Sequence, residues 1–182
     1  NSLSGITANA QIRKAISLAC DRTVFAQSAY NGYATAATSP FNPQASIAQN
    51  VKIFSSEADS ITAKQALNQS MIDSKELKIN ILVNKNNNRI ACATLLKNQL
   101  EAIGFTVTID EEGTKEYTRR VKNTEFNLYI GEVKLSDDMC LYPFFDDKSG
   151  GVRYGIDNEN LTCDDLYSAY LAGECDLGKF IL

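Results

Sequence analysis

Residues 77–109 have the sequence LKINILVNKNNNRIACATLLKNQLEAIGFTVTI and contain the clearest structural pattern of the chain. Leu77–Val83 alternates and then becomes apolar, which predicts a strand. Asn86–Ile103 carries apolar residues at helical spacing and is followed by Gly104, a residue that favours a helix end. Phe105–Ile109 predicts a second strand. A β–α–β unit of this kind makes its two strands parallel and its crossover right-handed.

Further elements are expected on both sides of this unit. Thr7 is expected to cap a helix that runs to Cys20, and Asp21 to cap a short second helix. The other expected elements are a helix from Asp59 or Ser60, a helix over Lys115–Lys122, a strand over Phe126–Ile130 and a helix over Cys163–Leu171. Residues 31–56 show no periodicity, and so long a loop is usually functional or lies over a surface. The order of elements indicates one α/β domain over residues 1–182, with a layered mixed sheet and helices on its faces.

The composition is that of an ordinary globular domain. At 182 residues the chain can form a substantial core, and 44% hydrophobic with 22% charged residues argues against disorder. The net charge is −4 and the basic residues are scattered, so nucleic acid is not an expected partner. No apolar run approaches the roughly 20 residues of a membrane-spanning helix. The chain starts at Asn1 without a Met, which favours a fragment of a longer protein.

The usage of cysteine and histidine argues against a metal or catalytic centre. The five Cys residues show no Cys-x-x-Cys spacing and the chain has no His, which excludes a classical zinc site or His-based catalysis. Cys20 and Cys92 lie among apolar helix positions and are expected to be buried. Cys163 and Cys175 could pair if the protein is secreted. We expect no catalytic residue, no metal and no cofactor.

Four motifs follow one another along the chain. The first is IRKAISLACDR, residues 12–22, followed by a loop that contains Gly32 and Pro40. The second lies in the β–α–β unit and comprises Arg89, Ala91, Leu95, Gln99, Leu100, Ile103, Gly104 and Val107. The third joins Tyr117 to the run EFNL at residues 125–128, and the fourth is DLYSAYLAG at residues 165–173.

This ordered set resembles the second lobe of the extracellular solute-binding proteins of family 5, the peptide- and nickel-type receptors of ABC importers. The resemblance implies one lobe of a class II periplasmic-binding-protein-like fold, which closes on a solute together with a first lobe of the same parent chain. The implied partners are an oligopeptide or similar small polar solute and an ABC permease. The implied location is extracellular, at the cell surface or in the periplasm, with a lipid anchor in the parent protein. The alternatives are an α/β domain of an intracellular enzyme or regulator, and an adhesion or interaction module.

The segment after the third expected strand departs from the resembled family. Peptide-binding members commonly have Gly-Trp-x-x-Asp there, whereas this chain has Glu132 at the Trp position and Leu135 at the Asp position. Asp137 or Asp138 could supply the acid from a shifted position. Adjacent acids otherwise usually face water, and the alternating ligand pattern of a calcium loop is missing.

Ligand-binding residues are expected in the loops near the strand ends. In open α/β sheets a ligand lies beyond the carboxyl ends of the strands, where aromatic side chains can hold it. Arg153, in the Gly-rich run of residues 149–155, could clamp an anionic end of the ligand or belong to a plain turn. The expected ligand-binding residues are Tyr33, Lys134, Asp137, Asp138, Tyr142, Arg153 and Tyr154.

Other conspicuous residues are assigned structural positions. Tyr129 is expected to pack against the sheet. Arg119, Arg120 and Lys122 are expected to form an exposed basic patch on a helix. Asp21 is expected only as a helix cap.

Overall fold

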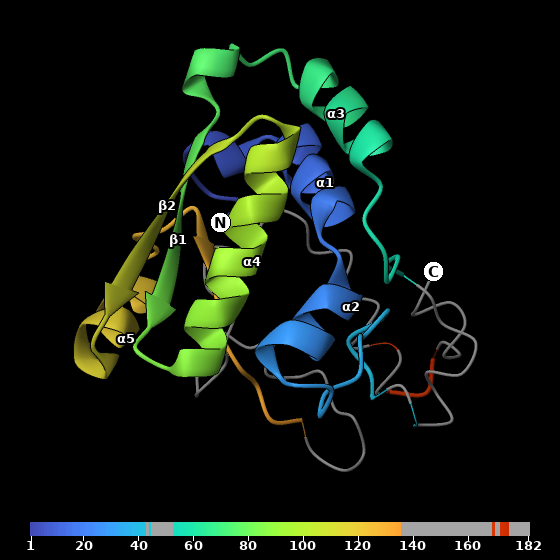
Figure 1. Ribbon diagram of the computed structural model, residues 1–182, viewed down its shortest axis with the longest axis vertical. Helices are drawn as coiled ribbons and strands as arrows, with labels where there is room; N and C mark the ends of the chain where they lie inside the picture. The colour runs from blue at the N-terminus through green and yellow to red at the C-terminus, as the bar shows by residue number, and fades with distance from the viewer. Residues whose placement is uncertain (43, 45–52, 136–168, 170–171, 175–182) are drawn as a thin grey trace.

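The computed structural model describes residues 1–42, 44, 53–135, 169 and 172–174. Its centre is a parallel sheet in the order β2-β1-β3 (Figure 1). The strands are β1 (Lys78–Asn84), β2 (Thr106–Glu112) and β3 (Leu128–Tyr129). All pairings between these three strands are parallel, so the α/β class and the β–α–β unit are confirmed, while no antiparallel partner is seen in this part of the chain.

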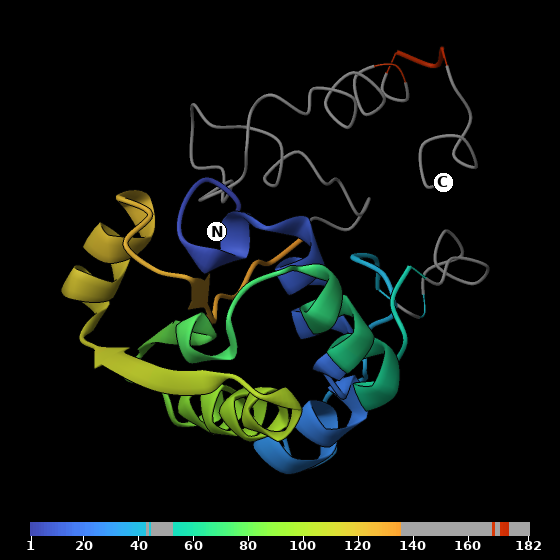
Figure 2. The same cartoon turned by 90° about the horizontal axis from the view of Figure 1, so that it is seen from above.

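Helices cover both faces of the sheet (Figures 1 and 2). One face carries α4 (Asn87–Ile103), and α5 (Thr114–Lys122) lies against the other. The alternation of β1 explains this arrangement, since Ile81 belongs to the core on the α4 side and Leu82 to a smaller core on the α5 side.

On the same side of the sheet as α4 lie two further helices, α1 (Ala10–Ala19) and α3 (Ser60–Gln69). They run side by side and antiparallel to each other (Figure 1). Their facing positions are mostly Ala, which lets the two helix axes approach closely. The buried positions that meet there are Ile12, Ala15, Ala19, Ala63, Ala66 and Leu67. Four shorter segments complete the described elements: η1 (Ile6–Ala8), α2 (Arg22–Val24), the π-helical η2 (Phe25–Ala29) and η4 (Ser74–Glu76).

Short polar side chains set the helix starts. The prediction that Thr7 caps the first helix is wrong, because Asn9 is the cap and its Oδ1 accepts the N–H groups of Gln11 and Ile12. Thr7 is instead fully buried. The expected cap of α2 by Asp21 is confirmed by hydrogen bonds from the N–H groups two and three residues later. At the end of α4, Gly104 has φ 118°, a conformation that favours glycine.

Two strand lengths differ from the sequence expectation. β2 extends to Glu112 because its polar end pairs with the apolar half of β1 and is held by side chains of α5. β3 is only two residues long, since the side chain of Asn127 takes over the pairing with β1 just before the strand begins. The expected helix over residues 163–171 lies outside the described residues, apart from Ala169.

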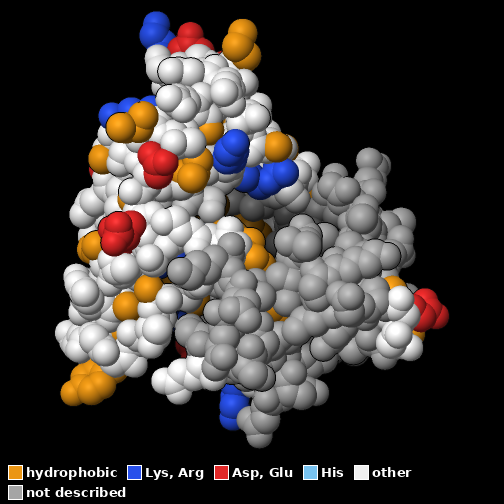
Figure 3. Space-filling view, turned by 90° about the vertical axis from the view of Figure 1, so that its right-hand side faces the viewer, with side chains coloured by type: hydrophobic (Ala, Val, Ile, Leu, Met, Phe, Trp, Pro, Cys, Tyr) orange, Lys and Arg blue, Asp and Glu red, His pale blue; other side chains and the backbone are white. Residues whose placement is uncertain are grey.

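The described surface mixes charges of both signs. Figure 3 shows Lys, Arg, Asp and Glu side chains interspersed on the described part of one face. No helix within the described ranges is both long enough and apolar enough to cross a membrane.

Candidate solute-binding site

A cavity of about 500 Å³ lies at the carboxyl edge of the sheet. Its walls come from the first turn of α4, from α5, from β3 and from the segment that follows β3. The lining residues are Pro40, Arg89, Tyr117, Thr118, Val121, Tyr129, Gly131, Glu132, Val133 and Leu135. This is the edge at which parallel α/β sheets bind ligands.

Arg89 is the cationic side chain among these lining residues. Its guanidinium donates to Asn84 Oδ1 at 2.8 Å and to Glu132 Oε2 at 2.7 Å. Asn84 is the last residue of β1, so strand and helix together orient the guanidinium. The Arg89 side chain is 20% exposed, whereas that of Glu132 is 74% exposed. The cavity therefore combines a guanidinium fixed by two hydrogen bonds with an exposed carboxylate.

Two tyrosines form the apolar side of the cavity. The Tyr117 hydroxyl donates to the carbonyl oxygen of Ile130 at 2.7 Å, which ties α5 to the segment after β3. Burial raises the pKa of Tyr117, so its hydroxyl stays protonated as a donor. Tyr129 packs edge-to-face on Phe126 with ring centroids 4.9 Å apart. The expected packing role of Tyr129 is confirmed, and the residue also lines the cavity.

A second, more apolar cavity of about 330 Å³ lies under the loop that follows η2. It is lined by Arg22, Phe25, Ala26, Tyr30, Ala34, Thr35, Ala36, Ala37, Ser39, Pro40 and Phe54. The Arg22 guanidinium lies 4.8 Å from the centre of the Phe54 ring and donates to the carbonyl oxygen of Ser55 at 2.8 Å. Arg22 thus links the segment that contains Phe54 and Ser55 to the start of α2. Pro40 lines both cavities.

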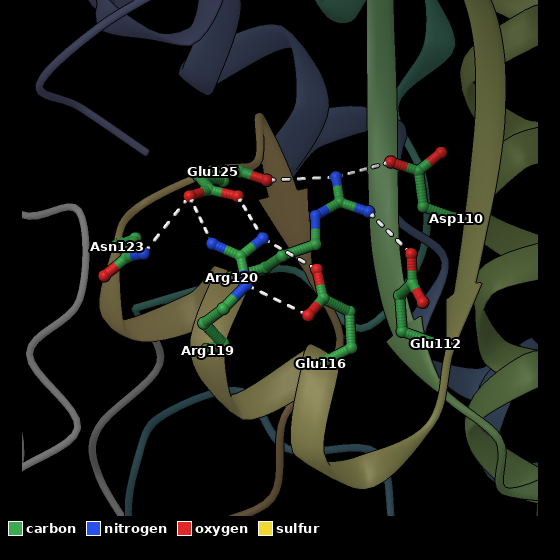
Figure 4. A network of polar contacts seen from close by, with 7 residues as sticks. All are labelled: Asp110, Glu112, Glu116, Arg119, Arg120, Asn123 and Glu125. Atoms are coloured by element: carbon green, nitrogen blue, oxygen red, sulfur yellow. Dashed lines mark hydrogen bonds and ion pairs between the residues drawn. The ribbon is translucent and has the colours of Figure 1, made fainter.

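The expected exposure of the basic residues on α5 is confirmed for Arg119 and Lys122 and is wrong for Arg120, which is partly buried. Both arginines are paired with acids (Figure 4). Arg119 forms bidentate contacts to Glu116 and Glu125, with distances from 2.7 to 2.9 Å. Arg120 is only 17% exposed and reaches Asp110 at 2.7 Å and Glu112 at 3.2 Å.

This network fixes α5 on the edge strand β2 and so positions one wall of the cavity. Burial disfavours ionised Asp110, but hydrogen bonds from Arg120 and Asn80 outweigh it and hold the pKa of Asp110 below its ordinary value. In this network each arginine pairs with carboxylates of the same chain, so we assign the network a structural role.

The cysteines that the structure describes are free thiols. Cys20 and Cys92 were expected to be buried and are only half-buried. Their partial burial still raises the pKa of both thiols. Raised pKa values keep the thiols protonated at neutral pH, which is typical of structural rather than reactive cysteines. Cys163 and Cys175 lie outside the described residues, so their pairing stays a prediction.

Comparison with known families shows which family this chain belongs to. The family of bacterial extracellular solute-binding proteins, family 5 (middle region), matches residues 1–151 of the 182. The chain belongs to this family. The match confirms the family resemblance and supports solute binding over the alternative of an intracellular enzyme or regulator domain. No curated protein sequence matched the chain.

Solved family 5 structures show the same fold. NikA from Brucella suis, in complex with Fe(III)-EDTA, superposes with a TM-score of 0.78 at 17% identity, covering 100% of this chain and 41% of that one. AppA from Bacillus subtilis, in complex with a nonapeptide, gives 0.75 at 18% identity, with 99% and 39% covered. NikA from Staphylococcus aureus, in complex with Ni(L-His)2, gives 0.74 at 20% identity, with 93% and 37% covered. The chain thus spans about two fifths of the length of these family 5 proteins.

The expected site residues fall mostly beyond the described part of this family 5 chain. Tyr33 lies in the turn after η2, is 95% exposed and lines neither of the two cavities. Lys134 is exposed and lies between two cavity-lining residues, Val133 and Leu135. Asp137, Asp138, Tyr142, Arg153 and Tyr154 are outside the described residues. A ligand role for these seven residues stays a prediction, as does the absence of a metal or cofactor.

The sequence interpretation did not select Arg89, Asn84 or Tyr117 as site residues. The sequence does contain a feature that could have singled out Arg89. A cation in the first turn of a long helix is unfavourable next to the helix dipole, so its presence there suggests a role outside the helix. The contact with Glu132 joins residues 43 positions apart and has no signal in local sequence.

Proposed function

We propose that residues 1–182 form the second, ligand-binding lobe of a two-lobed extracytoplasmic solute-binding protein. The parent protein captures an oligopeptide or a similar small polar solute between its lobes and passes it to an ABC permease. The activity is reversible binding without catalysis. The solute, the first lobe and the permease are the partners that this proposal requires.

The cavity at the carboxyl edge of the sheet carries the proposal. In a chain of this family it offers two tyrosines, apolar side chains, a held guanidinium and a carboxylate. Such a mixture of apolar walls and a few polar groups is typical of small-molecule sites. The NikA and AppA proteins were solved with metal complexes and a peptide, which supports a small polar solute as the ligand class.

A cavity on one lobe gains affinity when a second lobe covers it. Closed sites bury most of their ligand, so the isolated lobe binds weakly and closure supplies the remaining contacts. The solute then shifts the population from an open to a closed form by its higher affinity for the closed form. We place the parent outside the cytoplasmic membrane, at the cell surface or in the periplasm, held by a lipid anchor.

The test uses the parent protein with both lobes and measures thermal unfolding in the presence of pools of peptides, sugars and metal chelates. A solute present at 100 times its dissociation constant stabilises the folded form by about 2.7 kcal/mol, which raises the unfolding temperature by several degrees. Absence of stabilisation by every pool contradicts the proposal.

A matched pair of variants tests whether the solute binds in this cavity. Thr118→Trp fills the cavity from α5, while Thr94→Trp puts the same side chain on an exposed position of α4 that does not line it. We expect Thr118→Trp to abolish the shift given by the active pool and Thr94→Trp to leave it unchanged. Equal effects of the two variants would locate the solute elsewhere.

A further inference from the structure

Arg89 occupies a position that helix stability does not explain. It is the third residue of α4, after Asn87 and Asn88, and the first turn of this helix contains no acidic residue. The positive end of a helix dipole repels a cation, at a cost of a few tenths of a kcal/mol or more. An arginine is expected at this position only if it makes an interaction outside the helix.

The Arg89 guanidinium donates to two side chains of the same chain. Asn84 holds one guanidinium nitrogen from the strand side, and Glu132 meets the other from the segment after β3. Glu132 is the more exposed partner by far, at 74% against 20% for Arg89. Exposed ion pairs contribute only about 0.2–1 kcal/mol, so another carboxylate can replace Glu132 at little cost.

The cavity provides the room for that exchange. Arg89 and Glu132 line it side by side with Tyr117, Tyr129 and the apolar Val121. A solute carboxylate on Arg89 therefore places the rest of the solute against the tyrosines. Guanidinium and carboxylate groups match in a planar, two-bond geometry, which gives the exchange its selectivity over neutral groups.

We propose that Arg89 binds a carboxylate of the solute, and that Glu132 is an internal carboxylate that the solute displaces. The inference rests on the proposed function and narrows its solute class to molecules that carry a free carboxylate. Glu132 keeps the guanidinium paired when no solute is present and reduces the affinity for anions in general.

Acetate and acetamide are the probes, titrated into the ¹⁵N-labelled chain at constant ionic strength. The readout is the ¹⁵N signal of the Arg89 side chain. Glu132→Gln removes the competing carboxylate, and we expect it to tighten acetate binding about threefold, the worth of one exposed ion pair. Glu101→Gln is the control, because it removes one equally negative, partly exposed side chain at the far end of α4.

Arg89→Gln completes the set. We expect it to remove the response of the cavity residues to acetate, with the amide spectrum of the sheet confirming that the variant is folded. Acetamide is expected to give no response in any variant. The inference is wrong if acetate does not shift the Arg89 signal, or if Glu132→Gln and Glu101→Gln bind acetate with equal affinity. In either case the contact of Glu132 with Arg89 is only structural.

The two proposals fail separately. Stabilisation of the two-lobed parent by a peptide pool with no dependence on Arg89→Gln would overturn the role of Arg89 alone. Acetate binding at Arg89, in a parent that no pool stabilises, would overturn the proposed receptor function and leave the anion site in place.

Discussion

Asn80 and Asn127 exchange two hydrogen bonds across adjacent parallel strands, each backbone N–H donating to the side-chain oxygen of the other at 3.0 and 2.9 Å. The pair continues the β1–β3 contact one step before the regular pairing of Ile81 with Leu128 begins. Asn80 also donates from its side chain to Asp110 at 2.7 Å. One asparagine on the central strand therefore links both neighbouring strands.

Asn127→Ala is expected to lower the free energy of unfolding by about 1–3 kcal/mol, because it leaves the half-buried N–H of Asn80 without its acceptor. Urea unfolding measures the change. Asn98→Ala, at an exposed position of α4, is the control and should change stability by no more than about 0.5 kcal/mol. Equal effects of the two substitutions would contradict the importance of the asparagine pair.

The stability difference between the wild-type chain and Asp110→Asn is expected to depend on pH. The pKa of Asp110 is lower in the folded chain than its ordinary value, so its contribution is present above the unfolded pKa and is lost as pH falls through the folded pKa. We expect Asp110→Asn to cost about 1–2 kcal/mol at neutral pH and almost nothing once the pH lies below the folded pKa of Asp110.

Urea unfolding of Asp110→Asn between neutral and acidic pH measures this dependence. Glu57→Gln removes an exposed carboxylate elsewhere and controls for the change in net charge. A cost of Asp110→Asn that stays constant across the pH range would show that its ion pair with Arg120 does not stabilise the fold.

Gly131→Ala is expected to destabilise the fold by about 1–3 kcal/mol, the usual cost of forcing extra volume into a packed site. A Cβ at this position lies 2.6 Å from Tyr129 Cε2, so the ring must leave its place beside Phe126. In a Tyr129→Ala background the same substitution should cost little. A cost that persists without the Tyr129 ring would assign the effect to the backbone.

The two cores are expected to respond separately to truncation. Leu82→Ala should cost about 2–5 kcal/mol and reduce hydrogen-exchange protection first in α5, because Leu82 packs with Val121 and Phe126. Ile81→Ala, the neighbouring residue on the same strand, should affect α4 first. Loss of protection in the same helix for both variants would show that the faces of β1 do not unfold independently.

The sequence by itself determined the elements whose signals are local. The alternation in β1, the helical spacing of α4 and the glycine that ends it lie within a few residues of one another, so their pattern is legible without the fold. Local sequence patterns failed where two neighbouring residues were equally suitable as a helix cap. Thr7 and Asn9 are both capping residues, and only the burial of Thr7 in the folded chain selects Asn9.

Only the tertiary structure decided which charged side chains pair across the fold. Arg120 looks like an exposed charge on its helix, yet the crossover from β2 brings Asp110 and Glu112 within reach of its guanidinium. Arg89 and Glu132 meet for the same reason, since parallel strands bring their carboxyl ends to one edge although the residues are 43 positions apart. Periodicity in sequence encodes which residues are buried, whereas charge pairing depends on distances that exist only after the sheet has formed.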